Sequence, residues 1–360
     1  MRRTSWQNTG GVSAQFGNAV MTADIYLHAA LPFPSSLPEF QRLFPDDAAC
    51  AHYLERIRWE NGFVCPHCGV IGEPFRFAAK PGVLRCRQCR RDVALTAGTV
   101  MERTHTPLSV WFWAAYLVAS HTAGMSAVQF QRQLGLTRYE TAFQILHKLR
   151  AGMVRPDADR IGRPGENHIE VDETYIGGST RGEGRGVHHQ VCVAAAVEVL
   201  QRKTETKGKQ RRGGRYAGRL RLQIVPDRTA VELCGFVERA VEPGCMIVTD
   251  GWVSYNSLSQ RGYDHLPVAE CGDGAIAEEY LPISHLIFSN LKAWLKGCHH
   301  GVSPKHLQSY LNEFTFRFNR RFAPFNAFRS LLGIGGETAS PTCAALYSGE
   351  WQHPTASGHG

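Results

Sequence analysis

Two closely spaced pairs of cysteines constrain this chain more than any other feature. Cys65-x-x-Cys68 and Cys86-x-x-Cys89 are separated by residues 69–85. Each pair can offer two thiolates to one tetrahedral metal ion, so together they predict a zinc ribbon with four sulfur ligands. Four thiolates leave no position for water, so the expected Zn²⁺ is structural. A redox Cys-x-x-Cys pair is the alternative, but two pairs at this spacing favour zinc.

The residues around the cysteines suit such a ribbon. Pro66 and Gly69 stand where a tight turn needs them, and residues 75–77 and 83–85 have the pattern of short strands. The ribbon is expected to lie against DNA phosphates through its basic residues Lys80, Arg85, Arg87, Arg90 and Arg91. The net charge of +8 over the whole chain also favours a polyanionic partner.

A helical pattern follows over residues 106–153. Ser126 with Gln129, and Thr137 with Glu140, have the spacing of two capping boxes, and Gly135 lies between them. Helix, Gly-containing turn and helix is the arrangement of a DNA-binding helix-turn-helix; a plain helical bundle is the alternative. Contacts with the DNA groove are expected from side chains off the apolar stripe of the second helix, namely Thr141, Gln144, His147 and Lys148.

The second half predicts a mixed α/β sheet whose strands carry acids. Asp172 lies within the expected strand 169–175, and Asp250 ends the expected strand 245–250. An ionised carboxylate in such a place is costly unless it is paired or bound to a cation. Each acid alone indicates only a strand-end cap or a salt bridge. Together, on neighbouring strands, they predict a site for two Mg²⁺ or Mn²⁺ ions of the kind used in phosphodiester chemistry.

A third metal ligand is expected from the helix over residues 284–298, which contains no acid. Its predicted core stripe is formed by Leu291, Leu295 and Cys298, and Asn290 lies beside that stripe. Asn290 is therefore the predicted third ligand, with Lys292 and Lys296 available for phosphate. The open alternatives are the nearby acids Glu278, Glu279 and Glu313.

A basic insertion, residues 201–222, lies between two of the expected strands. It contains nine Lys and Arg residues, including Lys207, Lys209, Arg211, Arg212 and Arg215. Such a run is either a solvated loop or a hairpin that clamps the DNA backbone, and a clamp would make DNA binding steeply salt-dependent. The longest apolar run, residues 110–119, is about half of what a bilayer crossing needs. We therefore expect no membrane partner and a cytoplasmic, nucleoid-associated protein.

Residues 37–332 resemble bacterial insertion-sequence transposases of the ISXO type. The most specific matching runs are the Cys65 to Cys89 ribbon, Val171-Asp172-Glu173-Thr174-Tyr175-Ile176-Gly177-Gly178, Thr249-Asp250-Gly251 and Phe288-Ser289-Asn290-Leu291-Lys292. The resemblance implies an RNase H-like catalytic domain, Mg²⁺-dependent DNA cleavage and strand transfer, and recognition of the element's terminal inverted repeats. It also implies that Asp172, Asp250 and Asn290 bind the metal ions. The implied partners are double-stranded transposon ends and target DNA.

The resulting expectation is a multidomain chain. Residues 1–36 are an uncertain leader, 37–100 contain the zinc ribbon, 101–155 form the helix-turn-helix-like segment, 156–335 form the RNase H-like domain with insertion 201–222, and 336–360 form a tail. By analogy, the protein acts as a homo-oligomer on DNA. Two rival functions remain open: a catalytically inactive DNA-binding regulator, and a nuclease without strand transfer.

Overall fold

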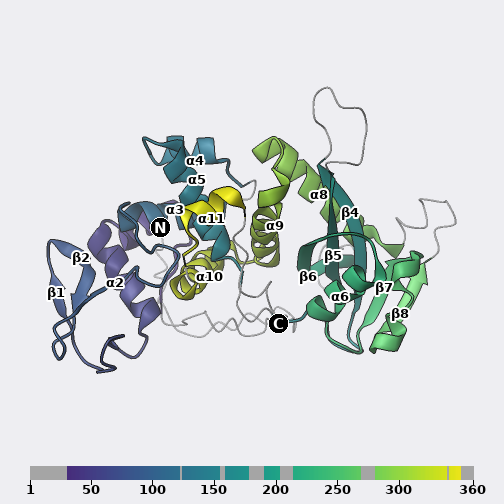
Figure 1. Ribbon diagram of the computed structural model, residues 1–360, viewed down its shortest axis with the longest axis horizontal. Helices are drawn as coiled ribbons and strands as arrows, with labels where there is room; N and C mark the ends of the chain where they lie inside the picture. Colours follow the sequence, from purple (N-terminus) through teal and green to yellow (C-terminus); the bar gives the residue numbers. More distant parts are fainter. Residues whose placement is uncertain are drawn as a thin grey trace, which may run out of the picture.

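The structure is a computed structural model that describes residues 31–121, 124–154, 159–177, 190–202, 214–268, 280–338 and 340–349. A helical part with a small zinc-ribbon sheet lies beside a part built on a five-stranded sheet (Figure 1). None of the helices in these ranges is long and apolar enough to cross a bilayer. The predicted fold class, a ribbon and helices followed by an α/β domain with a mixed sheet, is confirmed.

The N-terminal part begins with two capped helices. Ser36 caps α1 (Leu37–Leu43) and Asp46 caps α2 (Asp47–Arg58), each by accepting a backbone N–H in the first turn. The ribbon follows as an antiparallel sheet of β1 (Phe75–Phe77), β2 (Lys80–Arg85) and β3 (Asp92–Ala94). The helices α3 (Leu108–Ser120), α4 (Ala127–Gln133) and α5 (Tyr139–Ala151) complete this part of the chain.

The α4–α5 unit has the predicted order, but only one of its two capping boxes forms. Ser126 accepts the backbone N–H of Gln129, as expected. Thr137 does not cap the next helix, because α5 begins two residues later with Arg138 in the cap position and no side-chain hydrogen bond. His147, predicted to face a DNA groove, is buried instead.

The second part is a sheet with the strand order β6-β5-β4-β7-β8. The strands β4 (His168–Gly177), β5 (Gln190–Gln201) and β6 (Arg215–Val225) are antiparallel neighbours, whereas β7 (Met246–Asp250) and β8 (Asp264–Val268) run parallel to β4. The helix α6 (Ala230–Ala240) and the short helices η2 (Val253–Tyr255) and η3 (Ser259–Arg261) share a core with one face. The helices α8 (Pro282–His299) and α9 (Pro304–Asn319) share a core with the other.

After the sheet, the chain returns to the N-terminal core. The helix α10 (Pro324–Glu337) packs against α2 and α3, and Phe328 lies among the rings of Phe40, Phe44, Tyr53 and Phe112. The expected domain boundary at residue 335 therefore does not coincide with the boundary between the two cores, since α10 belongs to the first one.

Both ends of the described chain pack on the N-terminal part of the protein. Leu31, assigned to the leader, is buried there, and its carbonyl accepts a hydrogen bond from Arg329. The helix α11 (Cys343–Ser348), assigned to the tail, covers α5 by stacking Tyr347 on Phe143. Parts of the predicted leader and tail thus contribute to packing.

Candidate active site and metal centres

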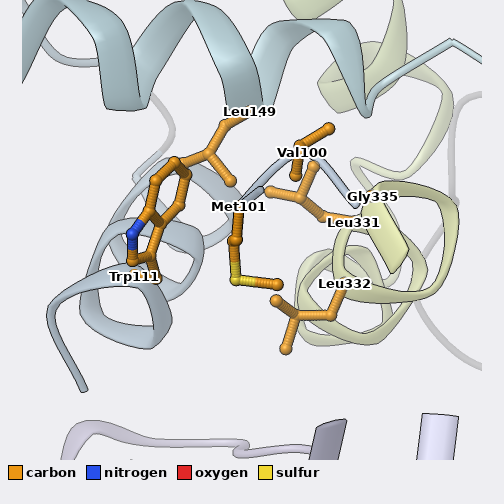
Figure 2. Close-up of a pocket in the computed structure, with 7 residues that line it drawn as sticks. All are labelled: Val100, Met101, Trp111, Leu149, Leu331, Leu332 and Gly335. Atoms are coloured by element: carbon orange, nitrogen blue, oxygen red, sulfur yellow. The ribbon is translucent and has the colours of Figure 1, made fainter. Parts of the chain in front are cut away.

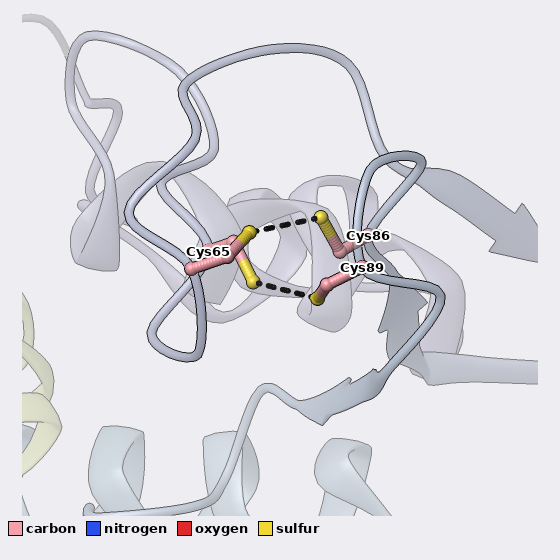
Figure 3. Close-up of side chains that lie close together, drawn as sticks. Cys65, Cys86 and Cys89 are labelled. Atoms are coloured by element: carbon pink, nitrogen blue, oxygen red, sulfur yellow. Dashed lines mark hydrogen bonds between the residues drawn. The ribbon is translucent and has the colours of Figure 1, made fainter.

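The four paired cysteines form one compact cluster. Their sulfur atoms all lie within 4.8 Å of one another, and Figure 3 shows the two pairs facing each other from separate turns. The sulfur atoms of Cys65 and Cys89 are 3.7 Å apart, as are those of Cys68 and Cys86. In a tetrahedron with Zn–S bonds of about 2.3 Å, the sulfur atoms lie about 3.8 Å apart. The cluster therefore fits a four-thiolate zinc site.

Asp172 and Asp250 lie side by side on neighbouring strands. The parallel strands β4 and β7 pair from His168 with Met246 to Glu170 with Val248. Two residues further along both strands, the same register puts Asp172 beside Asp250. Paired residues on parallel strands point to the same face of a sheet, so both carboxylates are directed to one place. The convergence expected from the two acidic strands is present.

Asp172 is held in an environment that disfavours its ionised form. It is only 8% exposed, and its Oδ2 atom lies 3.4 Å from the Ser284 hydroxyl and 3.5 Å from Nε2 of His285, both on α8. Burial, followed by the charges of Glu173 and Asp250, raises the pKa of Asp172 to about 7. A cation bound between the carboxylates of Asp172 and Asp250 would relieve this repulsion.

A second buried acid fixes α8 against β4. Glu170 is fully buried, and its Oε2 atom accepts the backbone N–H groups of Ile283 and Ser284 at 3.0 and 2.7 Å. These groups belong to the first turn of α8, where backbone donors lack partners within the helix. The hydrogen bonds hold the start of the helix, and with it His285, beside the strand that carries Asp172.

Two side chains on one flank of α8, His285 and Lys292, contact residues of β4. Lys292 donates to the hydroxyl of Thr174 at 2.7 Å, and it lies seven residues, two helical turns, after His285. Asn290 follows His285 by five residues, which places it about 140° around the helix. It is exposed. Lys296 is exposed one turn beyond Lys292.

His285 was not among the site residues predicted from the sequence. The predicted core stripe of Leu291, Leu295 and Cys298 is largely right, because Leu291 and Leu295 are buried and Cys298 is half-buried. Such a stripe has two flanks: Asn290 lies on one of them, and His285 and Lys292 lie on the other. The available signal was the seven-residue spacing of His285 and Lys292, which puts an imidazole and an ammonium on one side of the helix.

Arg228 makes charged contacts with both Glu173 and Asp250. The Arg228 guanidinium forms an ion pair with Glu173, and its Nη2 atom lies 3.8 Å from Oδ2 of Asp250. Glu173 also accepts the Tyr255 hydroxyl at 2.5 Å, so both of its oxygens are engaged. Burial, ahead of other causes, raises the pKa of Glu173, whereas the neighbouring Arg228 and Tyr255 favour its ionised form.

The other predicted candidates for the third metal ligand are Glu278, Glu279 and Glu313. Glu313 lies on α9, buried against Arg150 at 2.8 Å and Arg317 at 3.4 Å, so its carboxylate is already neutralised. Glu278 and Glu279 lie outside the described residues.

The predicted DNA contacts are only partly accessible. Thr141, Gln144 and Lys148 on α5 are half-buried, and Lys148 donates to the carbonyl of Glu102 at 3.2 Å. Arg215 is exposed at the start of β6, whereas Lys207, Lys209, Arg211 and Arg212 lie outside the described residues. The exposed surface of the α4–α5 unit lies instead on α4 and at the turn, at Gln129, Arg132, Gln133, Thr137 and Arg138.

A small apolar space in the N-terminal core is unconnected with these groups. Figure 2 shows Val100, Met101, Trp111, Leu149, Leu331, Leu332 and Gly335 around it. It has no room for a water molecule and no polar side chain except the Trp111 indole, whose N–H donates to Thr104. The space is a packing feature of α3, α5 and α10.

Comparison with known families gives the class of the two domains, which are those of a zinc-ribbon transposase. Residues 45–92 match the transposase zinc-ribbon domain, and residues 165–319 match the ISXO2-like transposase domain. These two matches confirm the resemblance seen in the sequence: the chain contains a transposase zinc-ribbon domain and an ISXO2-like transposase domain. The matched domain ends at Asn319, the last residue of α9.

One curated relative supports the same family. An uncharacterized protein in transposable element ISH50 of Halobacterium salinarum is 24% identical over 298 residues, which cover 77% of this chain and 92% of the relative. No solved structure matches the chain significantly.

Proposed function

We propose that the protein is a DNA transposase that binds the terminal inverted repeats of its insertion sequence, cleaves the DNA there and joins the released end to a target. The observation that carries this proposal is the side-by-side placement of Asp172 and Asp250 with His285 of α8 at the same carboxylate. The match of residues 165–319 to the ISXO2-like transposase domain supports it. The protein would act in the cytoplasm as a homo-oligomer on double-stranded DNA.

In this proposal Asp172 and Asp250 hold the metal ions, and α8 supplies the third ligand. The geometry favours His285 over Asn290. When bound, two Mg²⁺ or Mn²⁺ ions would activate the attacking water or 3′-hydroxyl and neutralise the leaving oxygen. Lys292 and Lys296, on the same flank of α8 as His285, would hold the phosphate backbone. Glu170 and Arg228 would fix the positions of His285 and Asp250.

The DNA would be bound over several surfaces. The exposed α4–α5 turn, with Thr137 and Arg138, is better placed to enter a groove than the half-buried Thr141, Gln144 and Lys148. The ribbon arginines and the insertion around Arg215 would contact phosphates. Such contacts predict a steep fall in affinity as salt increases.

The decisive experiment compares wild type with Asp250→Asn, His285→Ala and Asn290→Ala on a labelled duplex that carries the element's end, with Mg²⁺ or Mn²⁺. We expect Asp250→Asn and His285→Ala to bind the duplex but not cut it, and Asn290→Ala to cut it. Loss of cleavage in Asn290→Ala alone among the two α8 variants would assign the third ligand to Asn290.

The same assay separates the rival functions. Cleaved ends that become joined to a plasmid identify a transposase, whereas cleaved ends that stay free identify a nuclease. Wild-type protein that binds the end tightly but cuts it with neither metal would be a DNA-binding regulator.

A further inference from the structure

Trp252 is exposed directly beside the proposed catalytic carboxylates. It follows Asp250 by two residues, and its backbone N–H donates to Oδ1 of that carboxylate at 3.2 Å. The side chain is 40% exposed. It lies just beyond the end of β7, at the start of η2. A large aromatic surface is thus open to solvent at the edge of the site.

The indole ring is fixed rather than free. Its Nε1–H donates to the carbonyl of Arg228 at 3.3 Å, and the Arg228 guanidinium carbon lies 4.2 Å from the ring centroid. Arg228 is itself held by its ion pair with Glu173, and its carbonyl also accepts the Ser254 hydroxyl. The polar atom of the indole is therefore satisfied, and a cation lies against the ring.

Packing alone does not explain this arrangement. A tryptophan that serves the core buries its ring, whereas Trp252 leaves two-fifths of its surface in water. A rigid exposed aromatic ring with a guanidinium against it is suited to stack on a nucleobase. Every base has a flat aromatic face, so this contact needs no particular sequence.

We propose that Trp252 is a stacking site for an unpaired nucleobase next to the phosphodiester bond that the Asp172–Asp250 site cleaves. A base would leave the duplex to stack on the indole, and the scissile phosphate would thereby be fixed beside Asp250. This inference rests on the proposed function, because it assumes that the carboxylates act on DNA. It adds a substrate contact that is independent of metal ligands and of sequence recognition.

The test uses the full-length protein and end-containing duplexes with 2-aminopurine at successive positions around the cleavage site, in Ca²⁺ to separate binding from cleavage. An unstacked 2-aminopurine is bright, and stacking on an indole quenches it. We expect one position at which emission stays quenched with wild type but rises with Trp252→Leu, which keeps an apolar side chain without a ring. Trp252→Phe should give intermediate emission.

Cleavage in Mg²⁺ or Mn²⁺ supplies the second measurement. Loss of one stacked base should lower the cleavage rate of Trp252→Leu by roughly 5- to 150-fold, and that of Trp252→Phe by less. A duplex with an unpaired base at the quenched position should recover part of the loss, because the cost of opening the pair is then removed.

Met246→Ala is the matched control. Met246 is 42% exposed and starts the same strand, at the end opposite Asp250. It should match wild type in both measurements. If Trp252→Leu also matches wild type in emission at every position and in cleavage rate, the stacking site is excluded while the transposase proposal stands. If wild type neither binds nor cuts the end, the proposed function itself fails, and the stacking site with it.

Discussion

Buried charged and polar side chains join α5 to α9. Arg150 and Glu313 form a 2.8 Å ion pair with almost no exposure, and the Arg150 guanidinium also lies 4.0 Å from the ring centroid of Tyr310. His147 is packed between Phe143 and His306, and its Nε2 atom has no hydrogen-bond partner in the described structure. Transfer of a charged group from water into the protein interior is costly. These side chains therefore stabilise the contact between α5 and α9 only when all of them are present.

His147 makes stability depend on pH. Burial, assisted by Arg150, lowers the pKa of His147 from the usual 6.5 to about 2, so the folded protein keeps the ring neutral. Below pH 6.5 the unfolded chain takes up a proton that the folded chain does not, so stability falls as the pH decreases. Between pH 7 and 5 this one residue should cost about 2 kcal/mol.

The measurement is urea unfolding at pH 7, 6 and 5. His147→Leu should weaken the pH dependence by that amount, although its stability at pH 7 can differ from that of wild type. An equally steep pH dependence in the variant would mean that other groups, such as His299, whose pKa burial lowers to about 4, account for all of it.

At the scale of elements, the zinc ribbon should contribute to stability beyond its own loops. Cys65 and Cys86 are buried in the same core as Leu84 of β2 and Phe112 of α3. Loss of the zinc ion would let the Cys65–Cys68 turn separate from the Cys86–Cys89 turn and would expose that core to water. Structural zinc contributes directly to folding in this way.

We expect wild type to contain one Zn²⁺ per chain and Cys86→Ser to contain much less, with a lower midpoint of thermal unfolding. Metal analysis and a thermal melt check this. The exposed, isolated Cys343 provides the control, because Cys343→Ser should keep its zinc. Full zinc content in Cys86→Ser would show that the ion does not need this sulfur.

Sequence patterns predicted the local features best. The cysteine spacing predicts a four-sulfur cluster without knowledge of the rest of the chain. The two strand-borne acids, Asp172 and Asp250, predicted a shared site provided that their strands are neighbours, and β4 and β7 are neighbours. Helical periodicity identified the buried stripe of α8 but not which of its two flanks lies nearer to Asp172. The position of α8 on the sheet depends on a long-range contact, the hydrogen bond from the backbone N–H of Ile283 to Glu170, 113 residues away.

At the scale of the whole molecule, the N-terminal core is closed by a helix from the other end of the chain. Such a contact leaves no local signature, so the sequence placed α10 with the sheet. The end of α5 and the helix α10 approach each other closely, because a Cβ atom on Gly152, the residue after α5, would lie 3.0 Å from the Cα atom of Gly335. The Gly335 carbonyl also accepts the backbone N–H of Val100. Glycine at both positions lets α5 and α10 touch along their backbones.

Phe328→Ala should therefore destabilise a region nearly 300 residues away in sequence. Phe328 is 1% exposed among four aromatic rings, and removal of such a side chain typically costs about 3–5 kcal/mol. Hydrogen exchange should show faster opening of α1, α2 and α3, with β4, β5 and β6 unchanged.

The comparison is Phe322→Ala, six residues earlier and 76% exposed, for which we expect a change within about 0.5 kcal/mol. Equal effects of the two substitutions, or faster exchange confined to the sheet, would contradict the role assigned to α10.

The return of the chain to its first core has a consequence for the genetics of the element. A frameshift or stop codon between α9 and α10 would produce a chain that keeps the ribbon, the α4–α5 unit and the acidic strands but lacks the helix that closes the N-terminal core. Such a fragment would be recognised by proteases as unfolded and degraded. It could not occupy the DNA sites of the full-length protein, so damaged copies of the gene would not encode repressors of intact ones.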